Sequence, residues 1–165
     1  MQLRNGFTLI ELMVVIAIVA ILSSIGYPSF REFMLNGRLT AETNALLGAL
    51  QYARSEAVTQ KREVAVCPSA DQANCDIGNV DWSGRIIVRA ANGTVVRALP
   101  AQTNLTILDD ATPNITYEID GTSDTGGELR ICDERGDANS RTILVNRAGQ
   151  ARSRAFQNGD LTCGS

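Results

Sequence analysis

The chain has 165 residues, enough for one domain with its own hydrophobic core in addition to a terminal segment. Its 15 basic and 18 acidic residues give a net charge of −3, so the molecule as a whole is not expected to bind a polyanion such as nucleic acid. It contains no histidine, which excludes the usual catalytic triads and weakens any zinc-site interpretation.

The N-terminal stretch combines a glycine, a carboxylate and an uncharged run. Gly6 and Phe7 open a segment that reaches Glu11, and the nineteen residues from Leu12 to Phe30 carry no charge. About 20 apolar residues span a bilayer as a helix, so this run predicts a membrane helix. A cleaved secretory signal with its cleavage site near residues 23–26 is the alternative. Glu11 argues against it, because a carboxylate in hydrocarbon is costly and usually indicates a functional partner.

The stretch Gly6-Phe7-Thr8-Leu9-Ile10-Glu11 resembles the class III leader junction of type IV pilins and type II secretion pseudopilins. In that family a prepilin peptidase cleaves after the glycine and methylates the new N-terminal residue, which would be Phe7. Glu11 matches the family's glutamate, which neutralises the N-terminal ammonium of a neighbouring subunit. The resemblance thus implies a leader at 1–6, a transmembrane helix at 7–27 and a periplasmic or extracellular head at 28–165. Loss of the leader removes Arg4 and makes the net charge −4.

The helical pattern continues well beyond the membrane segment. We expect one long helix from Phe7 to about Gln60, interrupted but not ended by Gly26 and Pro28. After Pro28 the pattern becomes amphipathic. A stripe of apolar residues at helical spacing is expected to face the head, and four charged residues are expected to face water; the stripe is Leu46, Leu50, Ala53 and Ala57, and the charged residues are Glu42, Arg54, Glu56 and Lys61.

From Glu63 onward the period changes to two and turn residues recur about every ten positions, which predicts an antiparallel sheet. Asn92-Gly93 is the strongest hairpin signal. A helix against such a sheet makes the fold class α+β, which the pilin resemblance also implies. The expected strands are 63–67, 85–90, 94–99, 105–108, 115–119, 128–132 and 142–146.

Four cysteines lie beyond the membrane segment: Cys67, Cys75, Cys132 and Cys163. An even number in an exported domain favours disulfides, and the sequential pairing Cys67–Cys75 and Cys132–Cys163 is the simplest of three connectivities. Redox catalysis and zinc binding are disfavoured, because the chain has no Cys-x-x-Cys motif.

Motifs for catalysis and cofactor binding are missing from the sequence. We find no Gly-x-Ser-x-Gly, P-loop or dinucleotide motif, and Asp109-Asp110 lies in no loop with calcium-binding spacing. We therefore expect no enzymatic activity, no cofactor and no metal.

Residues 138–157 contain four arginines and no acidic residue. Such a local excess of positive charge can contact phosphate, so these arginines are candidate DNA-binding residues. Period-two spacing would place two of them on one face of a strand, with a third joining them across the turn at Ala148-Gly149. They are Arg152 and Arg154 on the strand, Arg147 before the turn, and Arg141.

The whole chain resembles the FimT/GspH family of minor pilins and pseudopilins. The resemblance rests on the end of the helix at residues 51–57, the strand that follows it, and a late strand with glycine and basic residues. Some DNA-uptake members carry Gly-Arg-x-Arg near the C-terminus. Here the stretch reads Gly149-Gln150-Ala151-Arg152, with Gln150 in place of the first arginine. This difference disfavours DNA binding, and the C-terminal region resembles FimU-type priming subunits more closely.

The resemblance implies a minor pilin of a type IV pilus that helps to prime the pilus tip or connect it to the major pilin. Its partners would be other minor pilins, the major pilin and prepilin peptidase. It would begin as a single-pass inner-membrane protein with a periplasmic head and end in the pilus at the cell surface. The alternatives are a DNA-binding minor pilin for natural transformation and a minor pseudopilin of a type II secretion system.

Overall fold

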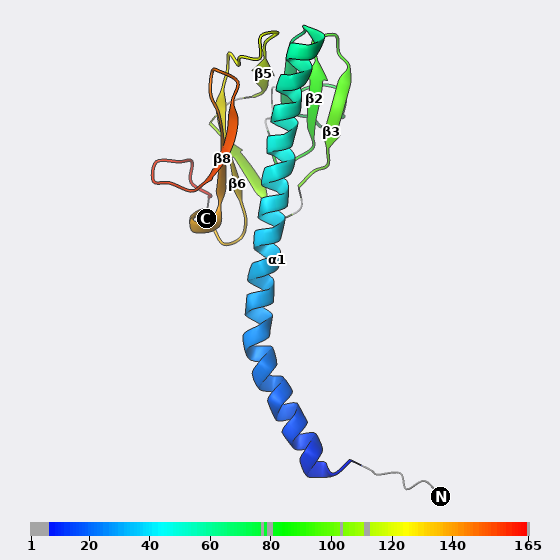
Figure 1. Cartoon of the computed structure of the whole chain (residues 1–165), viewed down its shortest axis with the longest axis vertical. Coiled ribbons are helices and arrows are strands. Elements are labelled where there is room, and N and C mark those ends of the chain that lie inside the picture. Colours follow the sequence, from blue (N-terminus) through cyan, green and yellow to red (C-terminus); the bar gives the residue numbers. More distant parts are fainter. Residues whose placement is uncertain (1–6, 77, 79–80, 103, 111–112, 165) are drawn as a thin grey trace, which may run out of the picture. The chain divides into compact units, whose positions relative to one another are not determined.

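The computed structural model describes residues 7–76, 78, 81–102, 104–110 and 113–164 (Figure 1). Gly6, the predicted cleavage residue, lies outside these residues. The chain divides into two compact units, Met1–Gly37 and Arg38–Ser165, which are described separately below.

Helix α1 runs from Leu9 to Gln60, which confirms one long helix ending at about Gln60. It begins two residues after the predicted Phe7, and the expected interruption at Gly26 and Pro28 is absent, since both residues are helical. It begins after Thr8 because the hydroxyl oxygen of Thr8 accepts a hydrogen bond from the Glu11 backbone N–H at 3.3 Å, which caps the first turn. Pro28 lies inside the helix. The helix ends where Lys61 adopts φ of 53°, a left-handed conformation typical of a helix C-terminus.

In the first unit, every residue of the range 7–34 is exposed within this chain. The helix is long and apolar enough in this part to cross a membrane. Large side chains such as Ile10, Leu22 and Phe33 have 68%, 65% and 71% of their surface exposed. A surface this apolar requires lipid or neighbouring protein around it.

In the second unit, one stripe of α1 is buried. It includes the predicted positions Leu46, Leu50, Ala53 and Ala57. Two residues expected to face water instead make specific contacts. The Arg54 guanidinium donates hydrogen bonds to two loop carbonyls, and Glu56 forms an ion pair with Arg62 at 2.8 Å. Arg54 and Glu56 lie on the flanks of the buried stripe, close enough to reach groups beside the helix.

All seven predicted strands are present, with boundaries shifted by one or two residues, and an eighth strand contains Arg152 and Arg154. The predicted hairpin at Asn92-Gly93 is also present, with Gly93 at φ of 89°. The strand predicted at 115–119 ends earlier because a turn begins at Glu118, whose carbonyl accepts from the Gly121 N–H. The strands are β1 (Val64–Pro68), β2 (Ile86–Ala90), β3 (Val95–Leu99), β4 (Thr106–Asp109), β5 (Ile115–Tyr117), β6 (Gly127–Cys132), β7 (Arg141–Val145) and β8 (Ala151–Ala155), with a short 3-10 helix, η1 (Asp137–Asn139), before β7.

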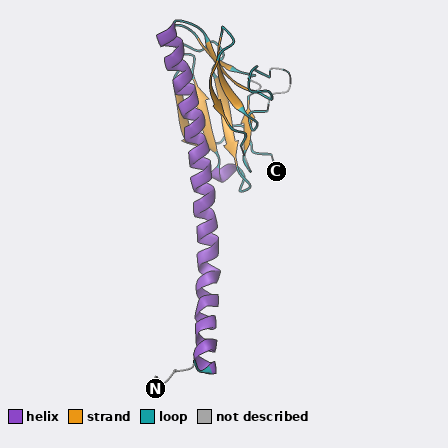
Figure 2. Ribbon diagram, turned by 90° about the vertical axis from the view of Figure 1, so that its right-hand side faces the viewer, coloured by secondary structure: helices purple, strands orange, loops and turns teal. Residues whose placement is uncertain are grey.

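These strands form two antiparallel sheets of four, where the sequence pattern suggested one. Their orders are β3-β2-β1-β5 and β4-β6-β7-β8, which we call sheet A and sheet B. Both sheets lie beside the second half of α1 (Figure 2). Their buried side chains and those of the helix form one apolar core. Val66 and Val88 come from sheet A, and Leu129 and Ile143 from sheet B. The α+β fold class is therefore confirmed, with the head built as two sheets around one helix.

Candidate functional site

The N-terminal candidate residues lie on the exposed part of α1. Phe7 has 80% of its surface exposed, and Glu11 is also exposed. Among the residues that the structure describes, no cation pairs with the Glu11 carboxylate. An unpaired carboxylate within an apolar surface requires a partner from another molecule if that surface is buried in lipid.

The four candidate arginines do not share one face of sheet B. The pairing of Leu144 with Arg152 and of Thr142 with Arg154 places both arginines on the face opposite the core. Arg141 begins β7 and, by strand alternation, points to the other face. Arg147 lies in the turn between β7 and β8, where its carbonyl accepts from the Ser123 N–H at 3.0 Å.

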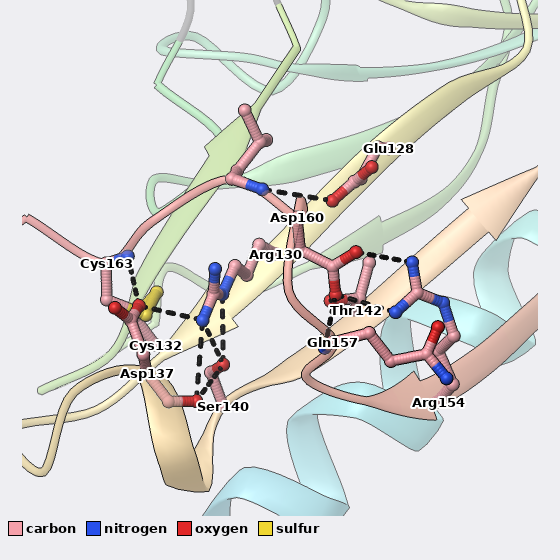
Figure 3. Close-up of polar contacts among 11 residues, drawn as sticks. Glu128, Arg130, Cys132, Asp137, Ser140, Thr142, Arg154, Gln157, Asp160 and Cys163 are labelled. Carbon is pink, nitrogen blue, oxygen red and sulfur yellow. Dashed lines mark hydrogen bonds and ion pairs between the residues drawn. A yellow bond between two sulfur atoms is a disulfide. The ribbon is translucent and has the colours of Figure 1, made fainter.

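Arg154 is already neutralised within the chain. Its guanidinium binds the Asp160 carboxylate, with Nη1 at 2.7 Å from Oδ2 (Figure 3). Asp160 also accepts hydrogen bonds from the Gln157 N–H and the Thr142 hydroxyl. The Arg154 hydrogen bond is the main cause that lowers the pKa of Asp160 to about 2, and the same contact raises the pKa of Arg154. Sequence reasoning missed Asp160 because the window of basic residues ended before it.

Gly149, the glycine of the stretch compared with the DNA-uptake motif, has a packing role. Its φ is 72°, and a Cβ atom there would lie 1.9 Å from the carbonyl oxygen of Gly121. Arg54 joins the two loops, because its Nε donates to Gly121 O at 2.9 Å and its Nη2 to Ala148 O at 3.1 Å. Glycine at 149 therefore lets the β7–β8 turn approach the loop after β5 under the end of α1.

The C-terminal segment, residues 156–163, folds back along the outer face of sheet B (Figure 3). We call it the tail. Its backbone is anchored at two points in addition to Asp160: the Leu161 N–H donates to Glu128 Oε1 at 3.3 Å, and the Cys163 N–H donates to Asp137 Oδ1 at 2.6 Å. A disulfide between Cys132 and Cys163 joins its end to β6.

Beneath the tail lies a fully buried cation, Arg130, which the sequence did not single out. Its Nε and Nη2 donate to the Ser140 hydroxyl oxygen at 2.9 and 2.8 Å, and Nη2 forms an ion pair with Asp137 at 2.7 Å. The ring of Phe156 lies 4.1 Å from the guanidinium carbon. Strand alternation could have placed Arg130 on the outer face, but nothing local in the sequence shows that a tail covers that face.

The other disulfide, Cys67–Cys75, closes the loop after β1, so the structure has the sequential pairing. Asp71 organises this loop by accepting hydrogen bonds from the Asn74 and Ala73 N–H groups, each at 2.8 Å. These bonds, above all those from Asn74, hold the pKa of Asp71 well below its usual range. Trp82, farther along, is fully buried. The disulfide and the hydrogen bonds to Asp71 together give the loop a defined conformation.

Two family models match the sequence. The model described as Type II transport protein GspH matches residues 42–149, and the Prokaryotic N-terminal methylation motif matches residues 1–27. Fimbrial protein EcpC of Eikenella corrodens is 31% identical over 142 residues, which cover 83% of this chain and 87% of that protein. The Type IV major fimbrial protein FimA of Dichelobacter nodosus is 29% identical over 74% of this chain and 69% of its own length.

Solved structures show the same fold. The type IV minor pilin FimU of Pseudomonas aeruginosa superposes with a TM-score of 0.57 and 25% identity, over 70% of this chain and 92% of that one. The minor pseudopilin EpsH from the type II secretion system of Vibrio cholerae has a TM-score of 0.55 over 76% of this chain and 99% of that one, at 11% identity, a likeness of fold alone. With a long apolar N-terminal helix, two antiparallel sheets and a GspH model matching most of the head, the chain belongs to the GspH family of type IV pilins and pseudopilins, which are structural proteins and not enzymes.

Proposed function

We propose that the protein is a minor pilin of a type IV pilus that helps to prime the tip or to connect it to the major pilin. The observation that carries this proposal is the likeness to the minor pilin FimU, which extends over 92% of that chain at 25% identity. The likeness to EpsH has a similar TM-score but less than half of that identity. Its partners are then other minor pilins and the major pilin.

We further propose how the N-terminus is used. Prepilin peptidase cleaves after Gly6 and methylates Phe7, in accordance with the methylation-motif match at residues 1–27. Residues 7–27 then hold the subunit in the inner membrane as a single pass, with the head, 28–165, in the periplasm until assembly carries it into the pilus. The exposed apolar surface of the first half of α1 supports this arrangement.

Glu11 gives assembly its register in this proposal. Its carboxylate has no cation partner among the described residues of its own chain, so it is available to the N-terminal ammonium of a neighbouring subunit. Two opposite charges buried together offset the desolvation cost that each would have alone. Apolar contacts hold the helix in the membrane, and the charge pair selects the docked position.

The test is Glu11→Ala, with Glu42→Ala on the same helix as the control. We expect Glu11→Ala to leave the amount in the inner membrane unchanged and to lower the amount in sheared pili by about tenfold or more, since one buried charge pair is lost. Glu42→Ala should be incorporated normally. Normal incorporation of the Glu11 variant would contradict the docking role, and Edman or mass analysis showing an N-terminus other than methylated Phe7 would contradict the processing.

A second candidate is a minor pseudopilin of a type II secretion system, which the GspH description of the matching model favours. The leader and fold are common to both systems, so partner identity separates them. If the protein is a minor pilin, cross-linking of the head in cells should yield adducts with pilins. Deletion of the protein should then reduce the number of pili. Adducts with pseudopilins, together with a defect in secretion and normal pili, would favour the second candidate.

We do not propose a DNA receptor. Of the four candidate arginines, Arg154 is neutralised by Asp160, and Arg141 points to the face opposite Arg152. Gln150 also stands where the DNA-uptake motif has its first arginine. Binding of DNA that weakens steeply with salt and is lost in Arg147→Ala and Arg152→Ala would contradict this assessment.

A further inference from the structure

The tail covers the outer face of sheet B through a polar seat, which we define as Arg130, Asp137 and Ser140. Arg130 is fully buried, and among the described residues its Nη1 has no hydrogen-bond partner. Even with its ion pair to Asp137, a buried guanidinium contributes little net stability, because the cost of removing both charges from water offsets much of their attraction. A buried polar network of this kind can instead specify which of several arrangements the chain adopts.

Asp137 connects this buried cation to one particular cysteine. Its Oδ1 lies 2.7 Å from Arg130 Nη2 and 2.6 Å from the backbone nitrogen of Cys163. Cys132 lies two residues after Arg130 on β6, so the two side chains point to the same face. When the Cys163 N–H donates to Asp137, the Cys163 thiol lies beside Cys132. Phe156, stacked on Arg130, fixes the other end of the tail over the same guanidinium.

Chain entropy by itself selects this disulfide only weakly. The Cys132–Cys163 pair closes a loop of 31 residues, and a pairing of Cys132 with Cys75 would close a loop less than twice as long. Since each doubling of loop length changes the closure probability by only about threefold, a disulfide exchange reaction in an unstructured chain would form both products. A preformed seat for Cys163 would remove this ambiguity.

We propose that the Arg130–Asp137 pair docks the tail before Cys132 and Cys163 are joined, and thereby selects this disulfide. Asp137 is then a positioning residue for oxidative folding of the head. In the exchange reaction, glutathione disulfide first forms a mixed disulfide with Cys132 and releases one glutathione. The Cys163 thiolate attacks the Cys132 sulfur, the protein disulfide forms, and the second glutathione leaves as a thiolate that takes up the proton lost by Cys163.

The experiment uses the full chain, reduced, unfolded, and refolded in detergent micelles with reduced and oxidised glutathione. Samples are trapped with a thiol reagent, and the pairings are mapped by mass spectrometry over time. Asp137→Asn removes the charge that pairs with Arg130. Asp133→Asn is the matched control, because it breaks a neighbouring buried ion pair, with Arg135, and among the described residues the Asp133 carboxylate makes no hydrogen bond to the tail.

We expect Asp137→Asn to slow formation of Cys132–Cys163 by about tenfold and to yield mispaired products, since a charge-assisted hydrogen-bond pair is lost. In molecules without a mispaired disulfide, Cys67–Cys75 should form at the normal rate, because the hydrogen bonds of Asp137 go to Arg130, Ser140 and Cys163 and not to that loop. Asp133→Asn should behave as the unaltered protein. Equal rates and pairings in Asp137→Asn and the unaltered protein would overturn the proposal.

A second measurement does not depend on oxidation. In a Cys132→Ser, Cys163→Ser variant we expect the backbone amides at positions 161 and 163 to remain protected from hydrogen exchange, because the seat docks the tail without the disulfide. Adding Asp137→Asn should lower protection at position 163 by about tenfold. If both amides exchange freely in the double cysteine variant with Asp137 intact, the tail does not dock first and the proposal is wrong.

Discussion

The two halves of helix α1 differ in what covers their apolar residues. In residues 7–34 every side chain is exposed within the chain, whereas between Leu39 and Ala57 a stripe at helical spacing is almost completely buried against both sheets. Both halves are α-helical. The second half therefore obtains its stability from its own chain, and the first half depends on contacts that only lipid or other subunits can supply.

The most direct test of this difference is to make the same substitution, leucine to alanine, in each half of α1. Leu50 is fully buried, so Leu50→Ala should lower the free energy of unfolding of the head by about 4 kcal/mol, the sum of lost burial and a cavity. Leu22 is 65% exposed within the chain, and Leu22→Ala should change that free energy by less than about 0.5 kcal/mol. Urea unfolding followed by the fluorescence of buried Trp82 measures both. Similar losses in the two variants would contradict the comparison.

A smaller loss of stability is expected from a substitution at Gly149, in the turn that Arg54 of the buried half of α1 joins to the loop after β5. Gly149→Ala should cost about 3 kcal/mol, because its positive φ is strained for alanine and the new Cβ would overlap Gly121 O. Gly159 also has a positive φ, 103°, but nothing lies within 4 Å of the added atom. Gly159→Ala should therefore cost only about 1 kcal/mol. Equal thermal stabilities of the two variants would show that the close approach at Gly149 does not matter.

The smallest effect is local and depends on pH. The pKa of Asp160 in the folded protein is about 2, below its ordinary value of 3.8, so its contacts stabilise the tail above about pH 4, and this contribution is lost as the pH falls through about 2. The apolar stripe of α1 carries no titrating group and should be unaffected directly. The protection of the Gln157 and Leu161 amides from hydrogen exchange, relative to the intrinsic rate at each pH, should therefore fall in acid before that of the core amides does.

Asp160→Asn separates this effect from other acid-sensitive contacts such as those of Asp71, whose pKa is also lowered. In this variant the tail amides should be less protected at neutral pH, and their protection should change little further between about pH 4 and pH 2. A variant whose tail keeps the protection and pH dependence of the unaltered protein would show that Arg154 and Thr142 hold the tail by other means.

Some features of the head were predictable because they depend on neighbours in the sequence. The stripe at Leu46, Leu50, Ala53 and Ala57 follows from helical spacing, and the hairpin at Asn92-Gly93 follows from turn chemistry. Seven strands were found from alternation to within one or two residues. The strand of Arg152 and Arg154 was recognised only through their spacing, because its small and polar residues carry little apolar alternation.

The arginines show where such reasoning fails. A count of charges in residues 138–157 treated four arginines as one patch, but the sheet register separates Arg141 from Arg152, and Asp160 neutralises Arg154. Arg54 was assigned to solvent from its place on the helix, yet it reaches carbonyls 67 and 94 residues away in the chain. The sequence does not indicate which two carbonyls Arg54 binds, because every residue has a carbonyl oxygen.

Short-range patterns in the sequence predicted the length of the helix, the apolar surface of its first half and the positions of most strands. Each of these depends on backbone preference and on the period of apolar residues, which act over a few neighbouring positions. The tertiary structure decided how the strands divide into two sheets, which charges pair, and that a tail encloses Arg130. Alternation tells which residues share a face but not what lies opposite that face, because strand pairing and tail docking join residues that are distant in the chain.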